Sequence, residues 1–122
     1  MPALRLTAFP ALLLALLLAA CGGGGSVDLA PPSINSRVIV VQDPTQPTVT
    51  TTYTFSSSTY TATGGDSGTY NYSKIGGTTT KANLLINSSF TTAQSYVLTF
   101  TSTGGGTYVD NNTSATSTFT FH

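Results

Sequence analysis

The chain has 122 residues, a formal net charge of zero and only 7% charged residues, so it is long enough for one small domain. Four Lys/Arg and four Asp/Glu side chains cannot form the extended charged surface that binding to a phosphate backbone or electrostatic steering requires, which excludes nucleic acid as a partner. A single Cys excludes an intramolecular disulfide, and a single His excludes most metal sites and nucleophile–base pairs.

The first element in chain order is a predicted signal peptide over residues 1–20. A short segment with one positive charge at Arg5 precedes an apolar run over 8–20 that only Pro10 interrupts. As a helix this run would cover about 20 Å, which is shorter than the roughly 30 Å hydrocarbon layer of a bilayer. The run therefore indicates export rather than a membrane-spanning helix.

The apolar run ends in Leu18-Ala19-Ala20-Cys21, which resembles the lipobox of bacterial lipoprotein precursors. The resemblance implies cleavage between Ala20 and Cys21 and attachment of diacylglycerol to the Cys21 thiol. Lipidation would anchor the chain to a membrane, because two or more acyl chains hold a protein stably. Many lipoproteins of Gram-negative bacteria stay at the inner membrane when Asp follows the lipidated Cys. Gly22 stands there in this chain, which implies the outer membrane and leaves the choice between periplasmic and surface-facing sides open.

Residues 21–36 are predicted to be the lipidated Cys and a flexible linker. Four glycines at 22–25 are followed by Pro31 and Pro32, a composition typical of a linker. We therefore expect the folded domain to span residues 37–122.

Residues 37–122 predict an all-β domain, because Thr, Val, Ile, Tyr and Phe are common and no helical periodicity is present. Alternation of apolar and polar residues is clearest at 82–86, 96–100 and 115–121. The expected strands cover residues 37–42, 48–55, 58–63, 68–74, 79–87, 94–102, 106–109 and 115–121.

Short glycine turns at 64–66, 76–77 and 104–106 join neighbouring strands, which predicts a small antiparallel meander. With about seven to eight strands, the sheet is expected to cover its apolar face by closing into a barrel or a sandwich. The phrase Gly-Thr-Tyr occurs after a glycine turn at 68–70 and again at 106–108, which indicates a reused hairpin.

The predicted core and the candidate ligand contacts overlap in the aromatic residues. The core is expected to contain Val38, Val40, Tyr53, Phe55, Tyr70, Tyr72, Leu84, Ile86, Tyr96, Leu98, Phe100, Phe119 and Phe121. Six tyrosines either pack in this core or line a barrel mouth where their rings and hydroxyls contact a ligand. They are Tyr53, Tyr60, Tyr70, Tyr72, Tyr96 and Tyr108.

Catalytic residues, a metal site and a cofactor site are not expected. The four carboxylates are Asp28 in the linker and Asp43, Asp66 and Asp110 in turns, where Asp is common for local reasons. Paired carboxylates or a His with a partner would be needed for general acid–base chemistry. Lys74 and Lys81 are expected to face solvent.

These observations predict a non-enzymatic, membrane-anchored lipoprotein of the bacterial cell envelope, whose small β domain serves in binding or structural association. Its partners would be the membrane, through Cys21, and a protein or envelope polymer. A lipocalin-like carrier is the alternative, and it would need a closed barrel with a cavity for a small apolar ligand.

Overall fold

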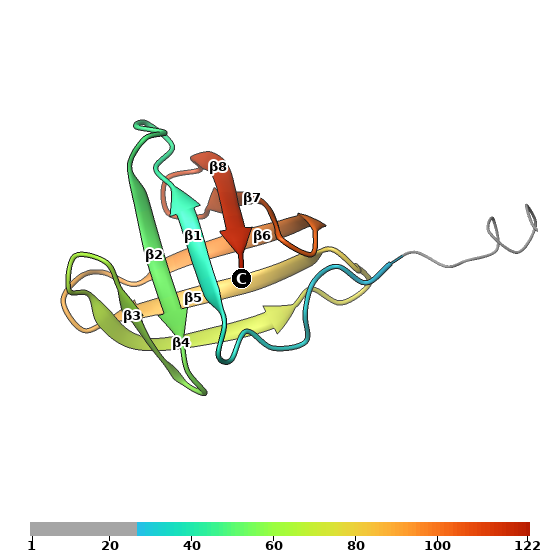
Figure 1. Cartoon of the computed structure of the whole chain (residues 1–122), viewed down its shortest axis with the longest axis horizontal. Coiled ribbons are helices and arrows are strands. Elements are labelled where there is room, and N and C mark those ends of the chain that lie inside the picture. Colours follow the sequence, from blue (N-terminus) through green and yellow to red (C-terminus); the bar gives the residue numbers. More distant parts are fainter. Residues whose placement is uncertain (1–26) are drawn as a thin grey trace, which may run out of the picture.

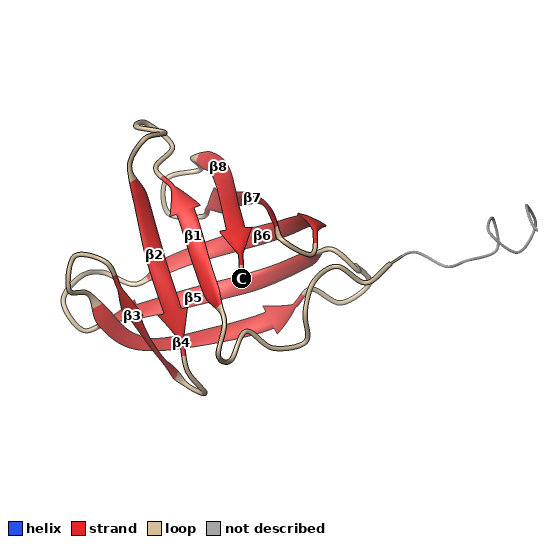
Figure 2. Cartoon of the chain, in the orientation of Figure 1, coloured by secondary structure: helices blue, strands red, loops and turns tan. Residues whose placement is uncertain are grey.

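The structure is a computed structural model that describes residues 27–122 (Figure 1). This part of the chain forms eight antiparallel strands that close into one barrel, and Figure 2 shows that loops, not helices, join them. The strands are β1 (Val38–Gln42), β2 (Thr50–Phe55), β3 (Thr59–Ala62), β4 (Ser67–Lys74), β5 (Lys81–Ser88), β6 (Gln94–Ser102), β7 (Gly105–Asp110) and β8 (Thr116–Phe121). The predicted all-β fold is confirmed, and it takes the barrel form. The signal peptide, Ala20 and Cys21 lie outside the described residues.

The barrel is a simple meander in which each strand pairs with its neighbours in sequence. β1 and β8 close it, with Ile39 opposite Phe121 and Val41 opposite Phe119. The turn between β3 and β4 contains Gly64 and Gly65, both at φ +90°, a backbone conformation that L side chains rarely adopt. The short turns therefore enforce antiparallel neighbours, as the sequence predicts.

The repeated Gly-Thr-Tyr phrase has a structural cause. Gly68 in β4 and Gly106 in β7 each lie so close to the neighbouring strand that an added Cβ would stand 2.0 Å from the Asn87 carbonyl oxygen and 1.9 Å from that of Thr99. Gly106 also lies between Phe100 and Phe119 in register, and those two rings meet edge to face at 5.1 Å. Each glycine thus allows a close strand approach.

Aromatic and aliphatic side chains fill the barrel interior, as expected for eight strands. The most deeply buried large side chains are Ile34, Ile39, Tyr60, Ile86, Leu98 and Phe100. The prediction that Val38 and Val40 belong to the core is wrong: both are only partly buried, and Ile39 between them is fully buried. Ile39 pairs with Tyr53 on β2 and with Phe121 on β8, and this register directs the Ile39 side chain into the barrel. Two more of the predicted core residues, Tyr70 and Tyr72, are partly buried and pack against the core. Six residues outside the prediction belong to the core: Ala30, Ile34, Ile39, Tyr60, Ala82 and Tyr108.

One end of the barrel is closed by residues 28–36, which we call the N-terminal strap. The backbone amides of Leu29 and Ala30 donate to the Thr79 carbonyl at 2.9 and 3.0 Å, and Tyr72 donates its hydroxyl proton to the Pro31 carbonyl at 2.7 Å. Ala30 and Ile34 are each only 1% exposed. This segment was expected to be part of a flexible linker, but its apolar side chains cover the end of the core and fix it to the barrel.

The strap also carries an ion pair. The Lys74 ammonium at the end of β4 donates to the Asp28 carboxylate. Lys74 is on the same strand face as Tyr70 and Tyr72, and its side chain is 28% exposed rather than fully solvated. The expectation that Lys74 faces solvent is therefore wrong, because the strap covers it, whereas Lys81 is exposed as expected.

Candidate functional site

The barrel end opposite the strap, which we call the mouth, is the candidate site. The loops at 43–49, 63–66, 89–93 and 111–115 surround it. Two open pockets lie there, of about 490 Å³ and about 200 Å³, and Tyr53 and Gln94 line both. The larger pocket is otherwise lined by Gly64, Gly65, Asp66, Phe90 and Thr91. The smaller one is lined mainly by Asp43, Tyr96, Tyr108 and Asp110.

Gln94, the first residue of β6, organises the tyrosine hydroxyls between the two pockets. Its Oε1 accepts a hydrogen bond from Tyr96 at 2.6 Å and a longer one from Tyr53 at 3.4 Å. Tyr108 donates its hydroxyl proton to the Gln42 carbonyl at the end of β1. Within residues 27–122 the Gln94 amide nitrogen has no bonding partner, so it is a donor available to a ligand.

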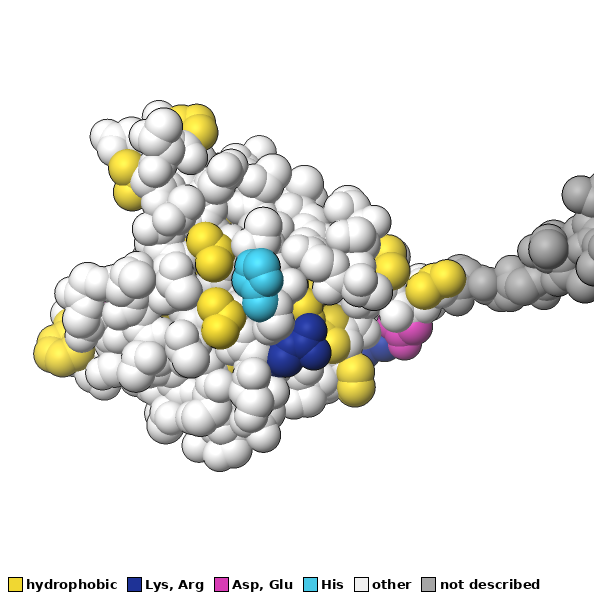
Figure 3. All heavy atoms as spheres, in the orientation of Figure 1, with side chains coloured by type: hydrophobic (Ala, Val, Ile, Leu, Met, Phe, Trp, Pro, Cys, Tyr) yellow, Lys and Arg dark blue, Asp and Glu magenta, His cyan; other side chains and the backbone are white. Residues whose placement is uncertain are grey.

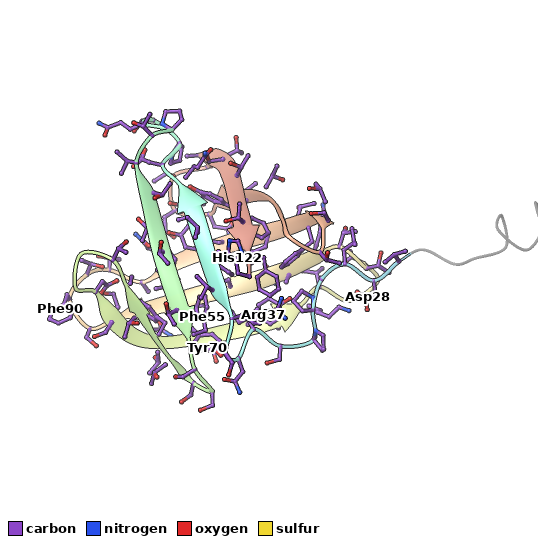
Figure 4. The ribbon with its side chains drawn as sticks, viewed as in Figure 1. Asp28, Arg37, Phe55, Tyr70, Phe90 and His122 are labelled. Atoms are coloured by element: carbon purple, nitrogen blue, oxygen red, sulfur yellow. The ribbon has the colours of Figure 1, made fainter. Side chains whose placement is uncertain are left out.

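A second network joins the β3–β4 turn to the β5–β6 loop. Asp66 accepts hydrogen bonds from the Tyr60 hydroxyl at 2.8 Å and the Ser88 hydroxyl at 2.5 Å. Ser88 Oγ in turn accepts the backbone amides of Phe90 and Thr91, each at 3.0 Å. The Phe90 ring, 72% exposed, extends at one extremity of the molecule while Asp28 lies at the other (Figure 4). These bonds connect the start of the loop that carries Phe90 to the β3–β4 turn.

Charge is segregated between the two ends of the barrel. Asp43, Asp66 and Asp110 all lie at the mouth. The basic side chains of residues 27–122 are Arg37, Lys74 and Lys81, which stand where β1 starts, where β4 ends and where β5 starts, all at the closed end. On the face shown in Figure 3, the charged side chains gather near the point where the chain enters. The mouth therefore disfavours anionic ligands.

The mouth tyrosines remain protonated over the physiological pH range. Burial, together with the hydrogen bond to Asp66, raises the pKa of Tyr60 to about 12. Burial is also the largest cause of the raised pKa of Tyr53, Tyr96 and Tyr108, and the Asp110 carboxylate adds to it in all three. Their hydroxyls therefore act as hydrogen-bonding groups and not as bases.

The six candidate tyrosines divide between the two ends. Tyr53, Tyr96 and Tyr108 line the mouth. Tyr60 lies beneath the mouth, where its hydroxyl donates to the Asp66 carboxylate. Tyr70 and Tyr72 belong to the closed end, where Tyr70 packs edge to face on Phe55 at 4.7 Å and Tyr72 contacts the strap. The sequence interpretation did not single out Gln94 and Phe90, since one polar residue and one aromatic in a Thr/Ser-rich stretch carry no distinguishing pattern.

The three mouth carboxylates have local structural roles. Asp43 Oδ1 accepts the Thr45 hydroxyl and backbone amide, each at 2.8 Å, and these bonds lower the pKa of Asp43. Asp110 Oδ1 accepts the Asn112 amide at 2.8 Å. In the described part of the chain no three His, Cys, Asp or Glu side chains form a group that would hold a metal ion. Nor do residues 27–122 contain a helix that is long and apolar enough to cross a membrane.

No protein-family model, curated protein or solved structure matches this chain.

Proposed function

We propose that this chain is a membrane-anchored lipoprotein of the bacterial cell envelope whose β-barrel binds a ligand or partner at its mouth. The observation that carries the proposal is the pair of adjoining pockets at the mouth, the larger of about 490 Å³, between which the Tyr53 and Gln94 side chains are shared. The strap covers the other end, where one polar pocket of about 220 Å³ lies between residues 32–34 and residues 70–72. The lipobox Leu18-Ala19-Ala20-Cys21 supports the anchor. The Gly22 residue supports the outer membrane as the destination.

The chemistry of the mouth supports a polar ligand without negative charge. Tyrosine hydroxyls, the Gln94 amide and three carboxylates supply hydrogen-bonding groups, and the exposed Phe90 ring supplies an apolar surface. With no basic side chain of residues 27–122 at the mouth, an anionic ligand would lack a counter-charge. A saccharide of the envelope or an uncharged protein segment fits these requirements.

A non-enzymatic role is part of the proposal. Asp43, Asp66 and Asp110 accept hydrogen bonds that fix turns and loops, and His122 lies at the closed end beside Val38. General acid–base or nucleophilic catalysis would need a group poised near neutral pKa beside a nucleophile. The lipocalin-like alternative receives less support, since the interior below the mouth is filled by side chains such as Leu98 and Phe100, each 1% exposed.

Binding is tested by native mass spectrometry of the chain from Gly22 onward after incubation with an extract of its own cells. The proposal predicts a retained small molecule or partner chain. Replacement Phe90→Ala should reduce this retention, while Val109→Ala, on a partly exposed residue of the β7 wall, should leave it unchanged. A bare chain, or retention equal in both variants, would contradict binding at the mouth.

A further inference from the structure

The closed end combines two features that bear on how the barrel meets a membrane. The described chain enters here, where Leu29 and Ala30 bond to Thr79 in the β4–β5 turn (Figure 1). Arg37 and Lys81 also lie at this end, and Lys81 is exposed.

We infer that the closed end docks on an anionic phospholipid surface and that the mouth faces away from the membrane. This inference rests on the proposed attachment at Cys21. It assigns the closed end as a lipid-facing surface and gives the mouth a direction.

The length of the tether supports this orientation. Asp28 is fixed to the barrel by Lys74, so six residues separate the anchor at Cys21 from a fixed point, and the seven Cα-to-Cα steps across them reach at most about 25 Å. β6 has nine residues, so a strand length of about 30 Å tilted by about 40° gives the barrel a height of about 23 Å. To bring the mouth to the bilayer, the tether would have to run almost fully extended along the barrel wall.

The charge distribution favours the same orientation. The exposed Lys81 would face the lipid headgroups, and the Lys74–Asp28 pair is neutral overall. Arg37 is partly exposed at the same end, with its guanidinium over the Phe121 ring and its Nε donating to the His122 carbonyl, so it adds a second positive charge there. The opposite orientation would bring Asp43, Asp66 and Asp110 against anionic headgroups. Basic residues within a Debye length of an anionic leaflet are attracted to it, and carboxylates are repelled.

This orientation restricts which molecules can reach the mouth. A mouth that stands about one barrel height from the bilayer meets molecules from the aqueous side. Acyl chains embedded in the same membrane do not reach Tyr53 or Gln94. The partner is therefore a soluble molecule or a polymer that lies beyond the membrane surface.

The test uses the chain from Cys21 onward, coupled through its only thiol to a maleimide lipid in phosphatidylglycerol/phosphatidylcholine vesicles. Chemical coupling replaces cellular lipidation, so failure of the proposed processing at Cys21 leaves this test valid. The chain has no Trp, which allows single-Trp reporters with energy transfer to a dansyl headgroup lipid. Gly76→Trp reports the closed end, where an added Cβ meets nothing within 4 Å, and Phe90→Trp reports the mouth.

The inference predicts transfer at least about threefold greater from Gly76→Trp than from Phe90→Trp, because the two positions differ by about one barrel height. Val49→Trp, in the β1–β2 loop, is a second mouth reporter and should behave as Phe90→Trp does. Equal transfer from both ends, or greater transfer from the mouth, would overturn the inference. If the ratio of energy transfer from Gly76→Trp to that from Phe90→Trp were unchanged in vesicles of phosphatidylcholine alone, the inference of an anionic surface would be wrong.

Discussion

The strap provides the most direct test of the fold, through the replacement Ile34→Ala. The Ile34 side chain is 1% exposed at the closed end of the core. Three buried carbon groups are removed, which costs about 2.4 kcal/mol in transfer free energy at roughly 0.8 kcal/mol each. The cavity that remains brings the expected loss to about 2–5 kcal/mol.

This loss is large for a domain of this size. Residues 27–122 number 96 (122 − 26), for which a free energy of unfolding of roughly 5–14 kcal/mol is typical. A loss of about 3 kcal/mol would lower Tm by roughly 12–24 °C. The measurement is thermal and urea unfolding of the chain from Gly22 onward, followed by far-UV circular dichroism.

The matched control is Val49→Ala, at a side chain that is 47% exposed in the β1–β2 loop. This variant should change the free energy of unfolding by less than about 0.5 kcal/mol. If Ile34→Ala were no less stable than Val49→Ala, the strap would not be part of the folded domain, and the short tether inferred from it would be wrong.

Two further predictions concern close packing and pH. Gly106→Ala should lower the free energy of unfolding by about 1–3 kcal/mol, because the added Cβ would stand 1.9 Å from the Thr99 carbonyl oxygen. Gly104→Ala is the control, since the atom nearest to its added Cβ is 3.9 Å away. Equal urea midpoints for the two variants would contradict the packing described for β7. The pKa of Tyr60 is about 12 in the folded state and 10.0 in the unfolded state, so between pH 10 and pH 12 the folded state binds more protons than the unfolded state. The free energy of unfolding should therefore fall as the pH rises from 10 to 12. This fall should be smaller in Tyr60→Phe, and an equal fall in both proteins, measured by urea unfolding at several pH values, would contradict the burial of the Tyr60 hydroxyl on Asp66.

The sequence predicts the antiparallel β meander because its local signals agree with one another, whereas the choice of a barrel over a sandwich follows from the pairing of β1 with β8. Glycine turns fix antiparallel neighbours, and alternation in the stretches 82–86 and 96–100 gives the correct inward face. At Val38–Val41 every residue is β-branched, so no alternation exists, and only pairing with β2 and β8 decides that Ile39 faces inward. A continuous apolar run therefore leaves the orientation of a strand undetermined.

The strap and the mouth were harder to predict because both depend on contacts between distant parts of the chain. Ile34 stands among Pro, Ser and Asn residues with no periodicity, so its burial is a tertiary effect. Gln94 becomes a site residue only because closure of the barrel brings Tyr53, forty-one positions away, to its amide. The tyrosines were recognised as a set, but which end each one faces follows from register.

Intact mass spectrometry of the native protein extracted from membranes reports directly on the proposed lipid anchor. We expect a chain that begins at Cys21 and carries diacylglycerol on its thiol, and we expect Cys21→Ser to abolish both the cleavage and the added mass. A membrane-extracted chain that begins elsewhere, or one that carries no lipid at Cys21, would mean that this protein is not a lipoprotein.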